Sequence, residues 1–146
     1  MPDEKSITRF SGQYRFLSNF YPLKEGVLLA DLVYPTVEHA YQASKTVNVM
    51  QRRLIQQAFS PGEAKRLGKK VSMRPEFEDI KVQVMLRLVR QKFKNPFLAN
   101  ILVATGDRVL VEGNDWGDQF WGESPVGTGK NKLGKILMKV RKETRV

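Results

Sequence analysis

The chain has 146 residues and no cysteine, so it is long enough for one domain with a buried core, and disulfide frameworks, thiolate metal sites and cysteine nucleophiles are excluded. Hydrophobic residues at 41% and charged residues at 27% are ordinary globular proportions, which exclude a disordered or fibrous chain. The formal net charge of +10 lies mostly after residue 59 and indicates a surface that attracts phosphorylated metabolites, nucleotides, nucleic acid or an acidic membrane.

The N-terminal third is rich in aromatic and turn-forming residues, and we expect short strands and loops there. Turns are predicted at Gly12 and at residues 24–26, and residues 27–33 are predicted to form a strand. Thr36 is a suitable N-cap for a short helix over residues 37–44, whose apolar residues recur at helical spacing.

Four further helices are predicted between residues 50 and 106. The first covers residues 50–58, and the second begins at the capping box of residues 60–63 and ends at Gly68. The third is opened by Pro75 and carries acids in its first turn and bases, Lys92 among them, in its last. The fourth, capped by Asn95 and ended by Gly106, is nearly all apolar and should be central.

The C-terminal part is predicted to hold a short strand at residues 109–111, a glycine-rich loop over residues 113–130 and a final amphipathic helix. Four lysines line the outer side of that helix and are most simply solvated. We therefore expect a single compact α+β domain over residues 1–146, dominated by helices, with a small sheet from the N-terminal third and the strand around Leu110.

The first five residues, Met1 to Lys5, show no basic stretch leading into an apolar core, and no apolar run reaches the roughly 18 residues of a membrane span. We expect a cytoplasmic protein with no membrane partner. The oligomeric state stays open.

The glycine-rich loop fails the Walker A pattern, because Ser124 stands where glycine is needed and Asn131 where serine or threonine is needed. Residues 127–131 nevertheless lead directly into a helix, a position that suits an anion. A plain turn is the equal alternative.

His39 has no second histidine and no cysteine to share a metal with, so we expect no metal site and favour a structural role for it. Glu38, Gln42 and Lys45 share one helical stripe. On spacing alone this stripe favours a solvated face, and the alternative is a carboxylate protected from water at the edge of an apolar face and ready for acid, base or electrostatic work.

The segment from Asn114 to Gly122 sets two acids among two tryptophans and a phenylalanine. Aromatic rings in a loop provide flat surfaces for stacking, and a nearby carboxylate provides charge. A ligand platform and a loop that fills its own small core are equally compatible with this pattern.

Several motifs in one order identify the chain as similar to the NADAR family, whose familiar members are YbiA-type N-glycosidases. The resemblance covers residues 10–141. Its motifs are residues 16–22, 34–45, 62–68, 92–93, 95–96, 102–107, 118–122 and 129–138.

The resemblance implies a YbiA-like fold and hydrolysis of an N-glycosidic bond to C1 of a phosphorylated ribose, without a cofactor. The substrate would be an early riboflavin-pathway intermediate, a ribosylaminopyrimidine phosphate, or ADP-ribose attached to guanine in nucleic acid. Because cleavage builds positive charge on the ribose, a carboxylate near C1 would stabilise the transition state and orient or deprotonate water.

Residue by residue, the resemblance makes Glu38 the first catalytic carboxylate and Asp118 the second, with Lys45 and Lys65 as candidates for a Schiff base with ring-opened ribose. The substrate would be bound by residues from four motifs: Ser18, Asn19, Phe20, Tyr21, Arg66, Phe120, Trp121, Gly129 and Asn131.

One position departs from the family pattern, because Phe77 stands where members commonly carry tryptophan after an Arg-Pro pair. Its ring either stacks on the base or packs in the core. The rival to an enzyme is a non-catalytic module that binds ADP-ribose or nucleic acid, although a pure binder has no need of two carboxylates.

Overall fold

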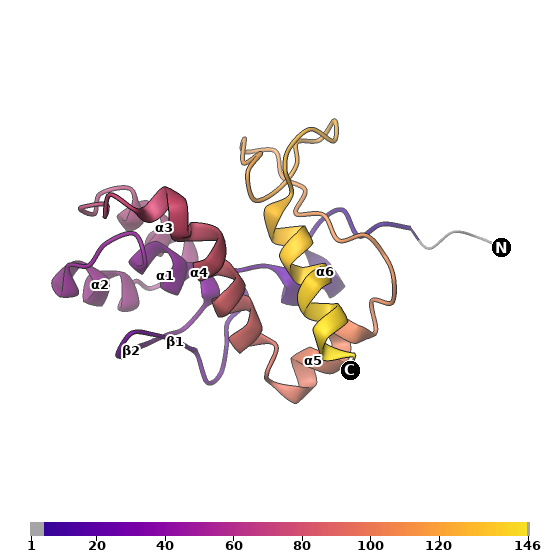
Figure 1. Ribbon diagram of the computed structural model, residues 1–146, viewed down its shortest axis with the longest axis horizontal. Coiled ribbons are helices and arrows are strands. Elements are labelled where there is room, and N and C mark those ends of the chain that lie inside the picture. Colours follow the sequence, from indigo (N-terminus) through magenta and orange to yellow (C-terminus); the bar gives the residue numbers. More distant parts are fainter. Residues whose placement is uncertain (1–4, 146) are drawn as a thin grey trace. The chain divides into compact units, whose positions relative to one another are not determined.

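The computed structural model describes residues 5–145 (Figure 1). Residues 1–4, which bear on the expectation about a leader, lie outside the described residues. The chain divides into two compact units: Asn19–Lys92 form one, and the segments on either side of it form the other. The expectation of a single domain stays a prediction.

The unit Asn19–Lys92 contains a two-stranded antiparallel sheet and four helices. Strands β1 (Val27–Leu29) and β2 (Leu32–Tyr34) pair with Leu29 opposite Leu32, which leaves a two-residue turn. The prediction of one strand over residues 27–33 is therefore wrong. The chain reverses at Ala30, whose φ of 53° lies in the left-handed region, and Ala30-Asp31 lacks the glycine or asparagine that marks such turns in sequence.

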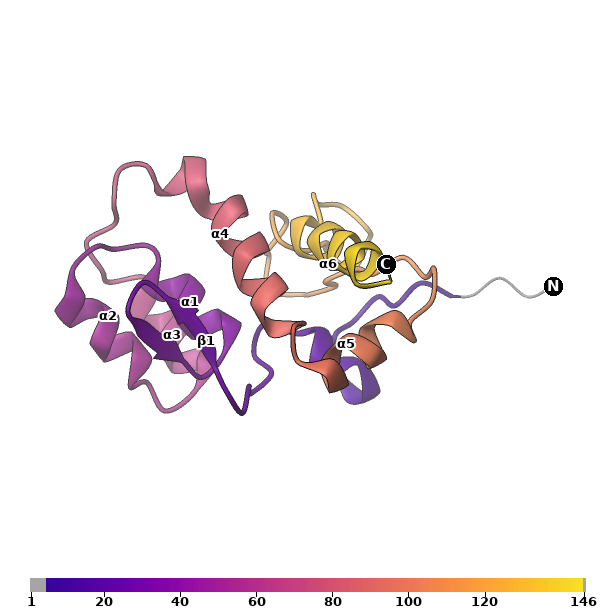
Figure 2. The ribbon, with the colours of Figure 1, turned by 60° about the horizontal axis from the view of Figure 1, so that its bottom comes forward.

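Side-chain caps begin the first three helices of this unit, as the sequence predicts for two of them. These helices are α1 (Val37–Ala43), α2 (Val49–Gln56) and α3 (Pro61–Gly68). Thr36, Asn48 and Ser60 each accept a hydrogen bond from the backbone N–H three residues later. Figure 2 shows the three helices gathered on one side of the hairpin.

Helix α4 (Phe77–Lys92) begins two residues after Pro75, because residues 74–76 form a turn in which Arg74 accepts the Phe77 N–H. Lys92, predicted as one of the bases in the last turn, is 3% exposed, with its Nζ 5.7 Å from the centroid of the Tyr21 ring. Burial lowers the pKa of Lys92 to about 7, since a low-dielectric surrounding disfavours the charged ammonium.

The second unit contains the 3₁₀ helix η1 (Gly12–Leu17), which the sequence did not predict, and helices α5 (Pro96–Val103) and α6 (Lys132–Thr144). The predicted strand at residues 109–111 is wrong. Leu110 forms only an isolated parallel bridge with Ile7, and no ladder continues from it in the described residues. Among residues 5–145 the hairpin forms the only sheet.

Helix α5 is not central in its unit, although it was predicted to be. Leu98 and Leu102 are buried, but Phe97 is 67% exposed, so only one side of this apolar helix has a partner. Helix α6 matches its prediction, because its apolar stripe is buried and Lys135, Lys139 and Lys142 are exposed.

The predicted class, α+β dominated by helices with a small sheet, is confirmed: within residues 5–145 there are six α-helices, one 3₁₀ helix and two strands. None of the described helices is both long and apolar enough to cross a membrane.

Replacing Lys92 with methionine should stabilise the protein most at low pH. The unfolded lysine keeps its proton up to a pKa near 10.5, whereas the folded one loses it near pH 7. Between these values the unfolded state binds more protons, so the free energy of unfolding of the native protein rises with pH, by at most about 1.4 kcal/mol per pH unit.

Chemical denaturation between pH 6.5 and 10.5 measures this effect, and the advantage of Lys92→Met should shrink steadily as the pH rises. Lys94→Met, which removes an exposed lysine two residues away, is the matched control. A stability difference that does not vary with pH would contradict the account.

Candidate active site

Every residue of α1 is buried, including the polar ones. Glu38 is 8% exposed and Gln42 3% exposed, so the solvated face favoured by spacing alone is wrong. Spacing cannot show that α2, α3, α4 and the hairpin all pack around this helix. The structure confirms that the carboxylate is protected from water, and its readiness for acid, base or electrostatic work stays a prediction.

Two hydrogen bonds fix the surroundings of Glu38. Gln42 Nε2 donates to Glu38 Oε2 at 2.6 Å, one helical turn away. The backbone N–H of Glu38 donates to the carbonyl of Asn19 at 3.0 Å. The segment before the hairpin is thereby tied to the first turn of α1, beside the carboxylate.

Lys45, just beyond α1, is half-buried and belongs to the electrostatic surroundings of Glu38. Its Nζ lies 5.9 Å from the centroid of the Tyr41 ring. Burial lowers the pKa of Lys45 and the Glu38 carboxylate opposes this by raising it, while Lys65 and Lys69 lower it and Glu78 raises it. A lysine with a lowered pKa has more of the neutral amine that acts as a nucleophile.

His39 is a structural residue. Its Nδ1 is 2.8 Å from the Thr36 hydroxyl, and its Nε2 is 3.1 Å from the carbonyl of Ala58. A neutral imidazole protonated at Nε2 makes both bonds, and burial lowers the pKa of His39. Within residues 5–145 no group of three or more histidine and acidic residues could hold a metal ion.

Asn19, Phe20 and Tyr21 form the segment that precedes the hairpin. Asn19 accepts from Glu38 through its backbone and donates from Nδ2 to the sulfur of Met85 at 3.5 Å. Phe20 is exposed, and Tyr21 is half-buried with its ring beside Lys92. Ser18 caps the C-terminus of η1 in the other unit.

Phe77 packs in the core rather than lining a site. It is 2% exposed, and its ring centroid lies 5.6 Å from that of Tyr41 in a tilted arrangement. The smaller ring at this position is therefore accounted for by packing within the unit.

Helix α3 carries Lys65 and Arg66 on its outer part. Lys65 is half-buried, and Arg66 is exposed, with its Nε donating to Glu63 Oε1 at 2.8 Å. Arg66 is held by a carboxylate of its own helix, so a phosphate would have to compete with Glu63 for it.

In the other unit, Asp118 organises the aromatic loop. Its Oδ1 accepts the backbone N–H groups of Phe120 at 3.1 Å and Trp121 at 2.9 Å. Asn114 is buried and makes two side-chain hydrogen bonds to the same turn. Its Nδ2 donates to the carbonyl of Asp118 at 2.9 Å, and its Oδ1 accepts a hydrogen bond from the backbone N–H of Asp118 at 3.0 Å. In the structure the Asp118 carboxylate therefore stabilises the conformation of the loop.

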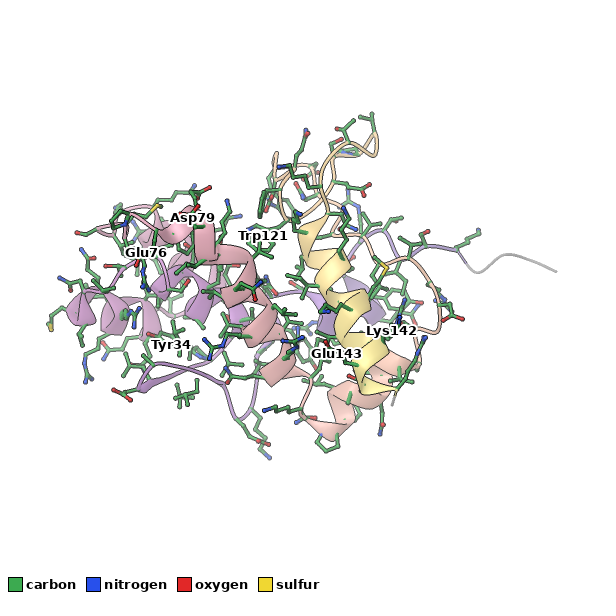
Figure 3. All side chains as sticks on the ribbon, in the orientation of Figure 1. Tyr34, Glu76, Asp79, Trp121, Lys142 and Glu143 are labelled. Carbon is green, nitrogen blue, oxygen red and sulfur yellow. The ribbon has the colours of Figure 1, made fainter. Side chains whose placement is uncertain are left out.

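The aromatic rings of this loop are partly open to solvent. Phe120 and Trp121 are half-buried and meet edge to face, with centroids 4.9 Å apart, and Lys130 Nζ is 5.6 Å from the centroid of Phe120. Trp116 is 61% exposed. Figure 3 shows Trp121 near the first turn of α6 and Lys142 and Glu143 toward its other end.

Most backbone N–H groups of the turn before α6 are already hydrogen-bonded to carbonyls of the preceding loop. The N–H groups of residues 130–133 donate to carbonyls of residues 119–122. Asn131 has a φ of 48°, and its side chain accepts from the N–H of Glu112 and donates to the carbonyl of Leu110. An anion at Gly129 would therefore rely mainly on side chains such as Lys130.

The structure brings together Glu38, Lys45 and Asn19 in the unit Asn19–Lys92, with Lys65 near enough to influence Lys45. Asp118, Phe120, Trp121, Gly129 and Asn131 share the other unit. Sequence reasoning placed Gln42 on the stripe and Asn114 at the start of the aromatic segment without giving either residue a role. The only signal for Gln42 was its spacing of four residues from Glu38.

The sequence model of the NADAR domain matches residues 8–145. The chain therefore belongs to the NADAR family.

Similar proteins fall into two groups by name, riboflavin biosynthesis proteins and N-glycosidases. The chain is 40% identical over 131 residues to a riboflavin biosynthesis protein of Vibrio vulnificus, of which it spans 35% while 88% of this chain is covered. It is 39% identical over 138 residues to an N-glycosidase of Nostoc punctiforme, with 90% of this chain and 86% of the relative covered. It is 36% identical to the N-glycosidase YbiA of Escherichia coli, with 91% and 83% covered.

The solved structure of E. coli YbiA, determined by NMR, matches with a TM-score of 0.82 at 33% identity and covers 99% of this chain and 88% of that one. The expected YbiA-like fold is confirmed. The relatives matched over most of both lengths support an N-glycosidase.

The electrostatic surroundings of Lys45 predict opposite effects of two substitutions. Glu38→Gln removes a negative charge that raises the pKa of Lys45, so the pKa of Lys45 should fall further. Lys65→Met removes a positive charge that lowers the pKa of Lys45, so the pKa should rise. Titration of the ¹³C-dimethylated lysines by NMR measures both, and shifts in the same direction would contradict the arrangement.

Proposed function

We propose that this protein hydrolyses the N-glycosidic bond of a phosphorylated N-riboside. The observation that carries the proposal is the buried Glu38 carboxylate, held by Gln42 in the same compact unit as a half-buried lysine whose pKa is lowered by burial. Membership in the NADAR family and similarity to proteins named N-glycosidase support the reaction class.

In this proposal Glu38 acts on the ribose at C1. As the bond to the base breaks, positive charge develops on the ribose ring, and a carboxylate removed from bulk water stabilises that charge more strongly than an exposed one does. The same carboxylate would orient or deprotonate the attacking water. Asp118, proposed as the second carboxylate, would act through the oxygen that does not cap the loop.

Lys45, or Lys65 in its place, would supply a nucleophile. The neutral amine would form a bond to C1 as the bond between C1 and the base breaks, and the base would leave with a proton. Opening of the ribose ring would give an imine, which water would hydrolyse to the free sugar and regenerated lysine. Lys45 is favoured because burial lowers its pKa.

The remaining residues would bind substrate. Phe120 and Trp121 present partly exposed rings for stacking on the base or ribose. Phosphate or pyrophosphate would be met by Lys65 and Arg66 and by the turn at Gly129 and Asn131, in keeping with the net charge of +10. Ser18, Asn19, Phe20 and Tyr21 would supply further contacts along the motif before the hairpin.

Two substrate classes fit this chemistry. The names of two relatives, riboflavin biosynthesis proteins of Vibrio vulnificus and Zea mays, favour a ribosylaminopyrimidine phosphate. These relatives are much longer than this chain, which spans 35% and 20% of them. The basic charge favours the second candidate, ADP-ribose on guanine in nucleic acid. The non-catalytic binding module remains the alternative function.

The deciding experiment incubates the protein separately with a ribosylaminopyrimidine phosphate and with guanine-ADP-ribosylated DNA. Release of ribose phosphate or of ADP-ribose identifies the substrate. Glu38→Gln, nearly equal in size, should lower turnover at least about 10³-fold because it removes the negative charge from the site, while the protein stays folded and binds ribose phosphate.

Full turnover by Glu38→Gln would refute the role of Glu38. Binding without release of product by the native protein would favour the binding module. If DNA is the carrier, turnover should fall steeply as salt rises, since phosphate contacts release counterions.

Borohydride added during turnover should trap the imine. The reduced product is a secondary amine, so intact mass spectrometry should find one sugar phosphate or ADP-ribose attached, and peptide mapping should place it on Lys45 or Lys65. The Lys45→Met and Lys65→Met variants tell the two apart. An unmodified mass in the native protein would argue against covalent catalysis and leave Glu38 with water as the mechanism.

A further inference from the structure

The side chain of Gln42 is buried, and its two amide atoms face different neighbours. Its Nε2 lies 2.6 Å from a carboxylate oxygen of Glu38. An ionised carboxylate only accepts hydrogen bonds, so the amide must turn its NH₂ group toward Glu38. Its Oε1 then points the opposite way and has no hydrogen-bond partner among the described residues.

The unpaired oxygen faces Gly68 of α3. A Cβ built on Gly68 would lie 2.7 Å from Gln42 Cδ and closer still to Gln42 Oε1. No real side chain tolerates that separation, so any residue other than glycine at 68 must displace the amide or the helix. The φ of Gly68 is that of an ordinary helical residue. Space for Gln42, rather than backbone freedom, is therefore what requires glycine here.

We propose that Gln42, for whose amide Gly68 leaves the space, is a positioning residue for the Glu38 carboxylate. The proposal rests on the proposed function of Glu38. A buried oxygen without a hydrogen bond has a cost, and the arrangement keeps it in order to aim an N–H at the carboxylate. That N–H stabilises the ionised form and leaves one orientation of the carboxylate.

Helix α3 therefore has two proposed roles at the site. Lys65 and Arg66 of this helix are proposed to meet the substrate, and its last residue, Gly68, leaves the space for the amide beside Glu38. The charged groups that act on Lys45 of this stripe are Glu38 itself, Lys65 and Lys69 from α3 and its C-terminal end, and Glu78 of α4, whereas Arg52 of α2 acts on Tyr34.

Gln42→Glu is the sharpest test, since it keeps the size of the side chain and replaces the donor with a second acid. Two carboxyl groups at this separation cannot both ionise, so they should share a proton. The acidic limb of the pH profile for kcat should move up by at least about one pH unit, so kcat at a fixed pH on that limb should fall at least about tenfold, with KM changed less than threefold.

Gly68→Ala tests the other side of the contact, and Gly62→Ala in the same helix is its matched control. A Cβ at Gly62 would come only within 3.8 Å of Ser60 Oγ. Gly62→Ala should therefore keep full kcat, whereas Gly68→Ala should lower kcat at least tenfold. In a Gln42→Ala background, Gly68→Ala should cost less than a further twofold, because the amide that it would displace is absent.

Thermal melting checks that each variant is folded, and ¹³C NMR of the Glu38 carboxyl gives a readout that needs no turnover. The pKa of Glu38 should rise in both Gln42→Glu and Gly68→Ala. If Glu38→Gln abolishes turnover but Gln42→Glu keeps the native kcat, pH profile and Glu38 pKa, the positioning role is overturned while the proposed function stands.

If the native protein cleaves no N-riboside, the proposed function fails and the NMR titration alone decides the positioning role. An unchanged Glu38 pKa in both variants would then overturn it.

Discussion

The burial of one short helix is the constraint on which the rest of this protein depends. Helix α1 has seven residues and none is exposed, although three of them, Glu38, His39 and Gln42, are polar. Burying such groups without partners would cost several kcal/mol. The Glu38 carboxylate is paired with Gln42 Nε2, and the His39 ring with Thr36 and with the carbonyl of Ala58 just after α2, whereas Gln42 Oε1 has no hydrogen-bond partner among the described residues.

The polar residues of α1 also determine which segments of the chain lie against this helix. The carbonyl of Asn19 accepts from Glu38, that of Ala58 lies beside His39, and Gly68 makes room for Gln42. Three segments, at residues 19, 58 and 68, thus converge on one helix. A carboxylate held in this way is reoriented only with difficulty, which is the property that a catalytic group requires.

The other unit contains a long loop without helices or strands, over residues 113–130, whose conformation is stabilised by hydrogen bonds. Asn114, Asp118 and Asn131 use their side chains to satisfy backbone groups, and the first N–H groups of α6 are paired with carbonyls of the aromatic segment. The loop is organised by hydrogen bonds rather than by a core of its own. Its rings therefore remain partly exposed, as a stacking surface needs.

The sequence by itself determined the helices with clear caps, the amphipathic pattern of α6, the α+β class and the family. These depend on local chemistry: a side chain three residues before a free N–H, or a repeat of apolar residues. It did not determine the turn at Ala30, because Ala30-Asp31 lacks the glycine or asparagine that marks such turns. It did not determine the lack of a strand at Leu110 either, because pairing there depends on Ile7, which is distant in the sequence. Nor could spacing reveal that Glu38, Gln42 and Lys92 are buried. Only the tertiary structure decided that, since burial and pKa depend on what packs around a residue and not on its neighbours in the chain.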